Sequence, residues 1–164
     1  MRNPKTLHDL LSEDVFDSRD LIERLEELEG ERSDLEQELE DRQEAHEAAV
    51  KAGDTTAALA AGEEAQEAAD DINEWDDDNL DELEVLREAN EQGENYVPDW
   101  TYGETLIAER YFTEYAMELA HDIGAVQVDE QWPHNHIDWE SAASELLHDY
   151  TEIVIGDRTY LARS

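Results

Sequence analysis

Histidine and carboxylate side chains alternate over one short stretch of the chain, and both kinds of side chain bind metal ions in proteins. A zinc site needs a defined set of three or four ligands, often with two histidines four residues apart on a helix. The stretch offers neither, so we predict loop histidines and a helix-capping aspartate, with no metal and no cofactor. The residues concerned are His134, His136, Asp138 and Glu140, with His121 and His148 farther away.

Paired carboxylates, the usual signature of general acid–base catalysis, carry little information in this chain. The sequence has 47 acidic residues among 164, so nearly any two turns of helix contain a pair. No glycine-rich phosphate loop, no nucleophile elbow and no cysteine occurs in it. We therefore expect a protein that is not an enzyme.

Negative charge is the dominant chemical feature of the sequence. The 47 acidic residues stand against 11 basic ones, which gives a net charge of −36. Such a surface repels phosphate backbones and anionic lipids, so we expect no direct binding to nucleic acid or to a membrane. A basic protein is the natural partner. No run approaches the roughly 20 apolar residues that span a bilayer, and we expect a cytoplasmic protein, in the host cell if a phage encodes it.

The acidic residues of two segments are almost as dense as the phosphates of duplex DNA. Residues 20–47 carry a net charge of −10 and residues 63–91 one of −13. Two such helices side by side would be about 42 Å long and about 20 Å wide, with one net charge per about 1.9 Å. Duplex DNA has one charge per about 1.7 Å. The predicted phosphate surrogates are Glu23, Glu27, Asp34, Glu38, Asp41, Glu64, Glu67, Asp71, Asp78 and Asp81.

Leucine spacing predicts the helix that carries the first acidic segment. From Leu21 to Leu39 the leucines follow steps of four and three residues, which is the spacing of a coiled coil. We predict that this helix has Asp17 or Ser18 as its N-cap and runs to about residue 51, where Gly53 ends it. The other predicted seam positions are Arg32, Arg42, His46 and Ala49.

A second helical stretch is predicted to begin at Thr55 or Thr56, with an alanine-rich face that permits close approach to another helix. The acidic run at 76–78 is predicted to break it, after which Asn79 and Glu82 would cap a further helix. With a short helix at 5–12, these segments form an acidic antiparallel helical hairpin of coiled-coil type. High charge with few aromatic residues is also typical of disorder, but the regular leucine spacing favours helices.

A shift in composition near residues 93–98 predicts a division of the chain. Residues 1–98 hold three of the twelve aromatic residues and form the acidic helical region, whereas residues 99–164 hold nine. For the second part we predict a small α+β domain with helices at 104–121 and 139–148, the first ended by Gly124 and the second capped by Asp138. A β-hairpin over 153–161, turning at Gly156 and Asp157, completes the α-rich fold.

Part of this second region resembles a known family. A helix of the form A-x-x-L-x-x-x-x-G is followed by I-D-W-E-x-x-A-x-x-L, then by D-Y and a terminal strand. This pattern resembles the C-terminal domain of ArdA-type antirestriction proteins, over about residues 104–162, and similar small domains of phages and their hosts. Members of that family are acidic mimics of duplex DNA that block restriction enzymes, so the resemblance implies such a role; the acidic helical region does not match the family's earlier domains. The matching residues are Ala116, Leu119, Gly124, Ile137, Asp138, Trp139, Glu140, Ala143, Leu146, Asp149 and Tyr150.

Three interpretations of the negative charge remain open. In the first, the protein is a DNA-mimic inhibitor that occupies the DNA-binding cleft of a basic protein, such as a restriction enzyme, a CRISPR effector, a nucleoid protein or a nuclease. In the second, an acidic coiled coil acts as an adaptor or chaperone for a basic protein. In the third, the acidity is adaptation to molar salt, which the small number of lysines, two against nine arginines, favours. A homodimer is compatible with each.

Overall fold

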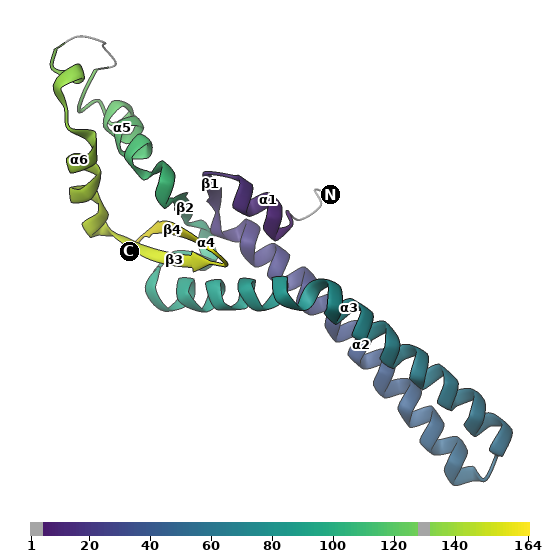
Figure 1. Ribbon diagram of the computed structural model, residues 1–164. Coiled ribbons are helices and arrows are strands. Elements are labelled where there is room, and N and C mark those ends of the chain that lie inside the picture. The colour runs from purple at the N-terminus through teal and green to yellow at the C-terminus, as the bar shows by residue number, and fades with distance from the viewer. Residues whose placement is uncertain (1–4, 128–131) are drawn as a thin grey trace. The chain divides into compact units, whose positions relative to one another are not determined.

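The computed structural model describes residues 5–127 and 132–164, and it is rich in α-helix (Figure 1). Two long helices, α2 (Ser18–Ala52) and α3 (Thr55–Tyr96), pack together, and a β-hairpin lies near the C-terminus. The predicted fold class is therefore confirmed. By its contacts the chain forms two compact units, Met1–Arg24 together with Val85–Ser164, and Leu25–Glu84. The division predicted from composition at residues 98–99 stays a prediction.

Helix α2 follows the predicted leucine seam. Leu21, Leu25 and Leu28 are buried, whereas Leu35 and Leu39 are half-buried. The leucine seam of α2 is therefore fully buried near the start of the helix and partly exposed farther along.

Both ends of α2 lie where the sequence predicts them. The carboxylate of Asp17 accepts the backbone N–H of Arg19 at 2.9 Å, which satisfies one of the free donors of the first turn. At the other end Gly53 has a φ of 74°, a left-handed conformation that costs glycine little. These limits confirm the predicted first helix.

Helix α3 runs without a break through the acidic run at 76–78, so the predicted interruption is wrong. Asn79 does not cap a new helix, because its side-chain amide donates to the carbonyl of Trp75 one turn earlier at 3.0 Å. Asp76 pairs with Arg32 of α2, which gives one charge of the run a partner. Aspartate is only a moderately poor helix former, and packing against another helix overrides such a preference.

The sheet has four antiparallel strands in the order β1-β2-β4-β3. Strands β1 (Val15–Asp17) and β2 (Thr105–Ala108) come from segments that were not expected to be strands. The helix predicted to begin at residue 104 is wrong over its first turns, since β2 and a 3-10 turn (Glu109–Tyr111) precede the helix there. Strand β2 pairs with β1 and β4, and partners so far away in sequence give no local signal.

The predicted C-terminal hairpin is confirmed as strands β3 (Tyr150–Ile155) and β4 (Arg158–Arg163). Ile155 pairs with Arg158, so Gly156 and Asp157 form a two-residue turn. Gly156 alone of these two has a positive φ, of 62°, which is the pattern of a type II′ turn with glycine in its first central position.

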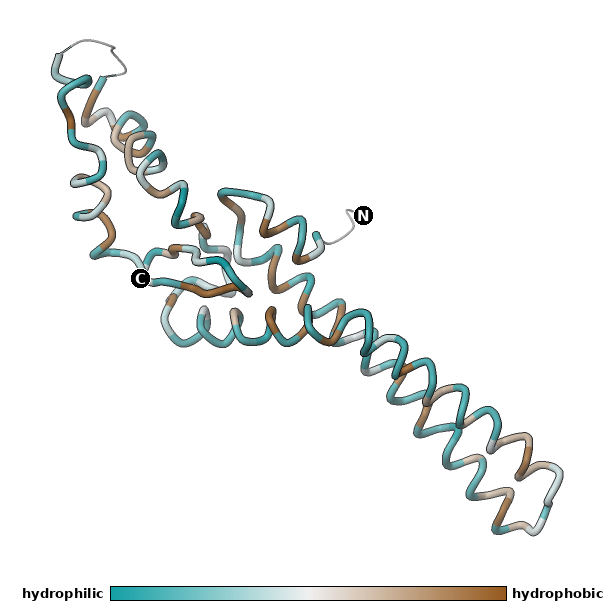
Figure 2. Tube along the Cα trace, in the orientation of Figure 1, coloured by the Kyte–Doolittle hydropathy of each residue, from teal (hydrophilic) through white to brown (hydrophobic). Residues whose placement is uncertain are grey.

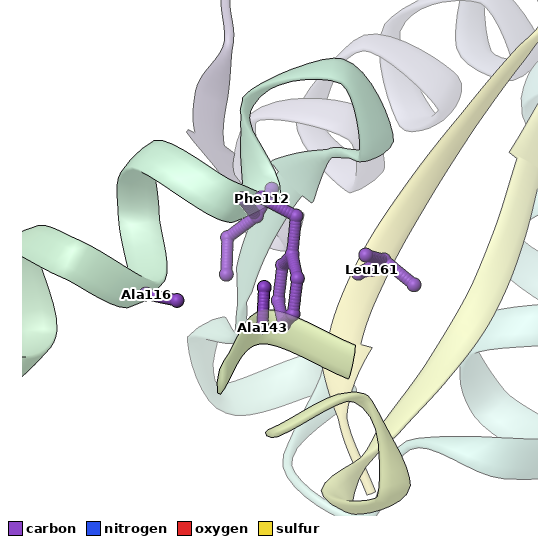
Figure 3. Close-up of a cluster of buried hydrophobic side chains, with 5 residues drawn as sticks. Phe112, Ala116, Ala143 and Leu161 are labelled. Carbon is purple, nitrogen blue, oxygen red and sulfur yellow. The ribbon is translucent and has the colours of Figure 1, made fainter. Parts of the chain in front are cut away.

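Helices α5 (Phe112–Asp122) and α6 (Trp139–Leu146) pack against each other beside the sheet. Gly124, with a φ of 72°, follows the end of α5, and Asp138 caps α6 by accepting the N–H of Ser141 at 3.1 Å, as predicted. A 3-10 turn (Leu147–Asp149) replaces the last residues of the predicted second helix. Figure 3 shows the core where these helices meet β4. It consists of Ile107, Phe112, Ala116, Ala143 and Leu161.

The other face of the sheet carries Phe16 and Tyr160, whose rings meet edge to face with centroids 5.0 Å apart. Helix α1 (Leu7–Ser12) lies nearby, since the Tyr160 hydroxyl donates to the carbonyl of Leu10 at 3.4 Å. The short helix α4 (Trp100–Gly103) buries Trp100, whose indole N–H donates to Asn90 of α3 at 2.8 Å. These contacts join both ends of the chain into one core.

Candidate functional site: the acidic helical hairpin

Residues 25–84 form a compact unit of two antiparallel helical segments, which we call the hairpin. It carries 24 acidic and 3 basic side chains, a net charge of −21. Its α2 segment is about 42 Å long at about 1.5 Å per residue. Over residues 5–127 and 132–164, no helix combines the length and the apolar character needed to cross a membrane. Because of its high negative charge, the surface of the hairpin is the candidate site.

An arginine fork fixes the two helices of the hairpin to each other. Arg32, at a predicted seam position, donates to both carboxylate oxygens of Asp76, at 2.9 and 3.2 Å, and also pairs with Glu36. The side chains of Arg32 and Asp76 are 28% and 24% exposed, so water screens this pair only in part. Hydrogen bonding to Asp76 raises the pKa of Arg32. Because this pair joins α2 to α3, it sets the register of the two helices.

Arg42 lies closer to the end of the hairpin and bridges two predicted phosphate surrogates. Its guanidinium donates to Glu64 of α3 at 2.6 Å and to Glu38 of its own helix at 3.3 Å. All three side chains are about half exposed, so solvent and salt weaken these pairs. Hydrogen bonding to Glu38 and the nearby charge of Glu64 raise the pKa of Arg42.

Two open clefts flank Arg42 and bring predicted surrogates from both helices together. One, of about 450 Å³, lies along α2, and the other, of about 370 Å³, lies between α2 and α3. Because the clefts share Glu38 and Arg42, their walls form one continuous surface, which we call the acidic face. Its carboxylates are those of Asp34, Glu38, Asp41, Glu64, Glu67 and Asp71.

The other four predicted surrogates lie outside the clefts. Asp78 and Asp81 are exposed and Glu27 is half-buried. All three stand seven or ten residues from members of the acidic face, so they continue the same stripes along their helices. Glu23 is also exposed but belongs to the other compact unit, and its part in the site stays a prediction.

The side of the hairpin away from the acidic face carries both neutral amides and carboxylates. Gln43 on α2, and Gln66 and Asn73 on α3, are neutral, but Glu36 and Glu29 precede Gln43 at seven-residue steps. Negative charge therefore surrounds the hairpin, and the clefts distinguish the acidic face from the rest of its surface.

Sequence reasoning missed two interactions that organise the hairpin. Asp76 was predicted as part of a helix break, but it binds Arg32. Glu31 accepts the indole N–H of Trp75 at 3.0 Å, which links the helices a second time. Polar residues at seam positions were the available signal, because an arginine in a coiled-coil seam requires a carboxylate opposite it.

The histidines considered as metal ligands have other contacts. His136 bonds Asn135 through its Nδ1, and Asp138 is held by Ser141, whose backbone and hydroxyl groups lower the pKa of Asp138. The rings of His121 and His134 stack with centroids 5.0 Å apart. Among the described residues, no group of three or more histidine or acidic side chains is arranged to hold a metal ion.

The acidic face offers carboxylates on a scaffold held by ion pairs, and this arrangement is suited to binding cationic side chains. No family model, curated protein or solved structure matches this chain. The resemblance of residues 104–162 to the antirestriction family therefore stays a prediction. The hairpin itself is the feature that bears on function.

Proposed function

We propose that this protein is a DNA-mimic inhibitor whose hairpin occupies the DNA-binding cleft of a basic protein and keeps DNA out of it. The observation that supports the proposal is the acidic face, where carboxylates of two helices line shared clefts on one side of the hairpin. Targets with a suitable basic cleft include restriction enzymes, CRISPR effectors, nucleoid proteins and nucleases.

Charge density supports this role over a merely solvated surface. The hairpin has a net charge of −21 along about 42 Å, or one charge per about 2 Å, close to the one per about 1.7 Å of duplex DNA. Such self-repulsion lowers the stability of a folded chain. We infer that this repulsion is retained because the negative electrostatic field of the hairpin attracts a basic partner.

The rigidity of the hairpin also supports mimicry. The partly shielded pair of Arg32 with Asp76 joins the two helices, so the carboxylates are in place before a partner binds. A surface that is ordered in advance loses less conformational entropy on binding than a flexible acidic tail does. An adaptor for basic tails does not require this order.

Competition with DNA tests the proposal directly. The protein is used to capture partners from a lysate of its host, and each captured DNA-binding protein is titrated on its own labelled duplex while fluorescence anisotropy is measured. We expect displacement of DNA at near-stoichiometric protein, and weaker inhibition as salt screens the contacts. A stable ternary complex of partner, DNA and this protein would contradict mimicry and favour the adaptor interpretation.

Neutralising the acidic face tests the site. A variant with Asp34→Asn, Asp41→Asn, Glu67→Gln, Asp71→Asn and Asp78→Asn should lose most of its inhibition, whereas each single change should be nearly silent, since exposed ion pairs contribute about 0–1 kcal/mol each. The matched control neutralises five exposed acidic residues that line neither cleft. These are Glu26, Glu40, Glu47, Glu63 and Asp70. Equal loss in both variants would show that net charge alone acts.

A further inference from the structure

The end of the hairpin differs in composition from the rest of it. Residues 48–62, which we call the tip, include seven alanines and two glycines, and their two charged side chains, Lys51 and Asp54, have opposite signs. In Figure 2 white and brown segments cluster at this end of the hairpin, whereas teal dominates the rest of it. The tip is thus a nearly neutral, apolar end on a highly charged structure.

Two large apolar side chains of the tip point into solvent. Val50 is 57% exposed and Leu59 is 67% exposed. Val50 lies seven residues after Gln43, and Leu59 lies seven residues before Gln66, so both stand on the side of the hairpin away from the acidic face. Exposed alanines of the tip, such as Ala52 and Ala57, add to its apolar surface.

The tip is built as an ordered surface. The backbone N–H of Ala57 bonds the carboxylate of Asp54 at 3.0 Å, so Asp54 caps the start of α3. His46 Nδ1 bonds the carbonyl of Ala58 at 2.8 Å, and a Cβ at Gly62 would lie 3.2 Å from the His46 ring. The helices thus approach closely here, which orders the backbone that carries the apolar side chains.

We propose that the tip is a self-association surface, through which two copies of this chain form a reversible dimer. For two copies, electrostatics favours contact tip to tip over contact of the hairpins side by side. Everywhere else along the hairpin two copies would bring like charges together, whereas an overlap limited to the tips lets their acidic segments diverge. Lys51 is exposed, and in this arrangement it comes alongside the acidic residues that flank the other tip, Glu47 and Glu63. This inference does not depend on the proposed function.

The small size of the tip sets the strength of the dimer. Stable interfaces bury about 1,200–2,000 Å² in total, and fifteen mainly small residues on each side provide less. The dimer therefore forms at high protein concentration. Salt strengthens it, because salt screens the repulsion between the acidic segments but not the apolar contact. This salt dependence is opposite to that expected of a complex with a basic partner.

Sedimentation equilibrium of the full chain tests the proposal. We expect a monomer–dimer equilibrium that shifts toward dimer as salt rises to about 1 M, where the Debye length is about 3 Å. The double variant Val50→Glu, Leu59→Glu should weaken association at least tenfold. The control Gln43→Glu, Gln66→Glu adds the same charge to the same side of the hairpin, outside the tip, and should leave most of the association in high salt. A protein that is monomeric under all these conditions, or a dimer that the tip variant leaves intact, would overturn the proposal.

A second measurement covers the case in which the charged tip variant loses helicity. The sequence contains no cysteine, so Thr56→Cys places one pyrene label on the tip without further changes. We expect excimer emission that grows with protein concentration and salt. The same label at the exposed Thr113→Cys of α5 should give monomer emission alone. Excimer from position 113 and none from position 56 would place self-association elsewhere and contradict the proposal.

Discussion

At the scale of single residues, the two seam arginines of the hairpin have different roles. Arg32 forms a bidentate, partly shielded pair with Asp76, whereas Arg42 forms half-exposed pairs with Glu38 and Glu64. The first contributes more to the stability of the hairpin, because solvent screens it less. The second lies within the acidic face and neutralises part of its charge.

Replacing each arginine by glutamine separates these roles. We predict that Arg32→Gln lowers the melting temperature of the hairpin, because Asp76 loses both of its hydrogen bonds from the guanidinium. Arg42→Gln should change the melting temperature little and should strengthen inhibition of the partner, because it frees Glu38 and Glu64. Circular dichroism melts and the anisotropy titration measure the two effects. Weaker inhibition by Arg42→Gln would argue against phosphate mimicry at this face.

Two glycines of the long helices provide a matched pair of stability predictions. At Gly30 a Cβ has no atom within 4 Å, so Gly30→Ala should stabilise the protein by about 0.5–1 kcal/mol through helix propensity. At Gly93 a Cβ would lie 2.1 Å from the Trp100 ring, so Gly93→Ala should destabilise by about 1–3 kcal/mol or more. Urea unfolding of both variants checks the opposite signs. A stabilising Gly93→Ala would mean that Trp100 does not pack there.

At the scale of secondary-structure elements, helix caps make stability depend on pH. Hydrogen bonds from Ser141 hold the pKa of Asp138 below its ordinary value. A carboxylate whose pKa is lower in the folded than in the unfolded state stabilises the fold above about pH 4, and this contribution disappears as the pH falls below the folded pKa.

Removing the cap tests this dependence. Asp138→Ala should lower the melting temperature by a few degrees at pH 7, and the difference from the unmodified protein should vanish as the pH falls through the folded pKa of Asp138. Asp138→Asn, which keeps a capping side chain, should lose less at pH 7. Thermal melts of the three proteins across this pH range measure the effect. A difference in melting temperature between the unmodified protein and Asp138→Ala that grows toward acid pH would contradict the prediction.

The elements also show what could be predicted from the sequence. Periodicity identified α2 with both its ends, and turn chemistry identified β3 and β4, because these signals are local. Strands β1 and β2 could not be predicted, since their pairing joins residues about 90 positions apart. The acidic composition located the candidate site, but the clefts around Arg42 depend on how α2 and α3 are aligned. That alignment is set by contacts such as Arg32 with Asp76 and cannot be read from either helix alone.

At the scale of the whole molecule, the net charge of −36 makes salt the decisive condition. In about 0.1 M salt the Debye length is about 10 Å, so much of the repulsion within the hairpin persists. An inhibitor that acts in ordinary cytoplasm must fold there. We predict cooperative loss of helicity on heating in dilute buffer, with a melting temperature that rises as salt is added. Helicity that appears only above about 1 M salt would contradict the proposed function and favour adaptation to salt.

The connectivity of the two compact units has a consequence for how this protein can change. Residues 25–84 are inserted between two segments that pair through β1 and β2, so the chain leaves one core and returns to it. Seven residues can be added to, or removed from, each helix of the hairpin at facing positions. Such a change does not alter the fold of the other compact unit. Deleting residues 36–42 together with 64–70, which face each other in the register of the Arg42–Glu64 pair, shortens the hairpin by about 10 Å. The length of the hairpin can thus change while the fold of the other unit stays the same.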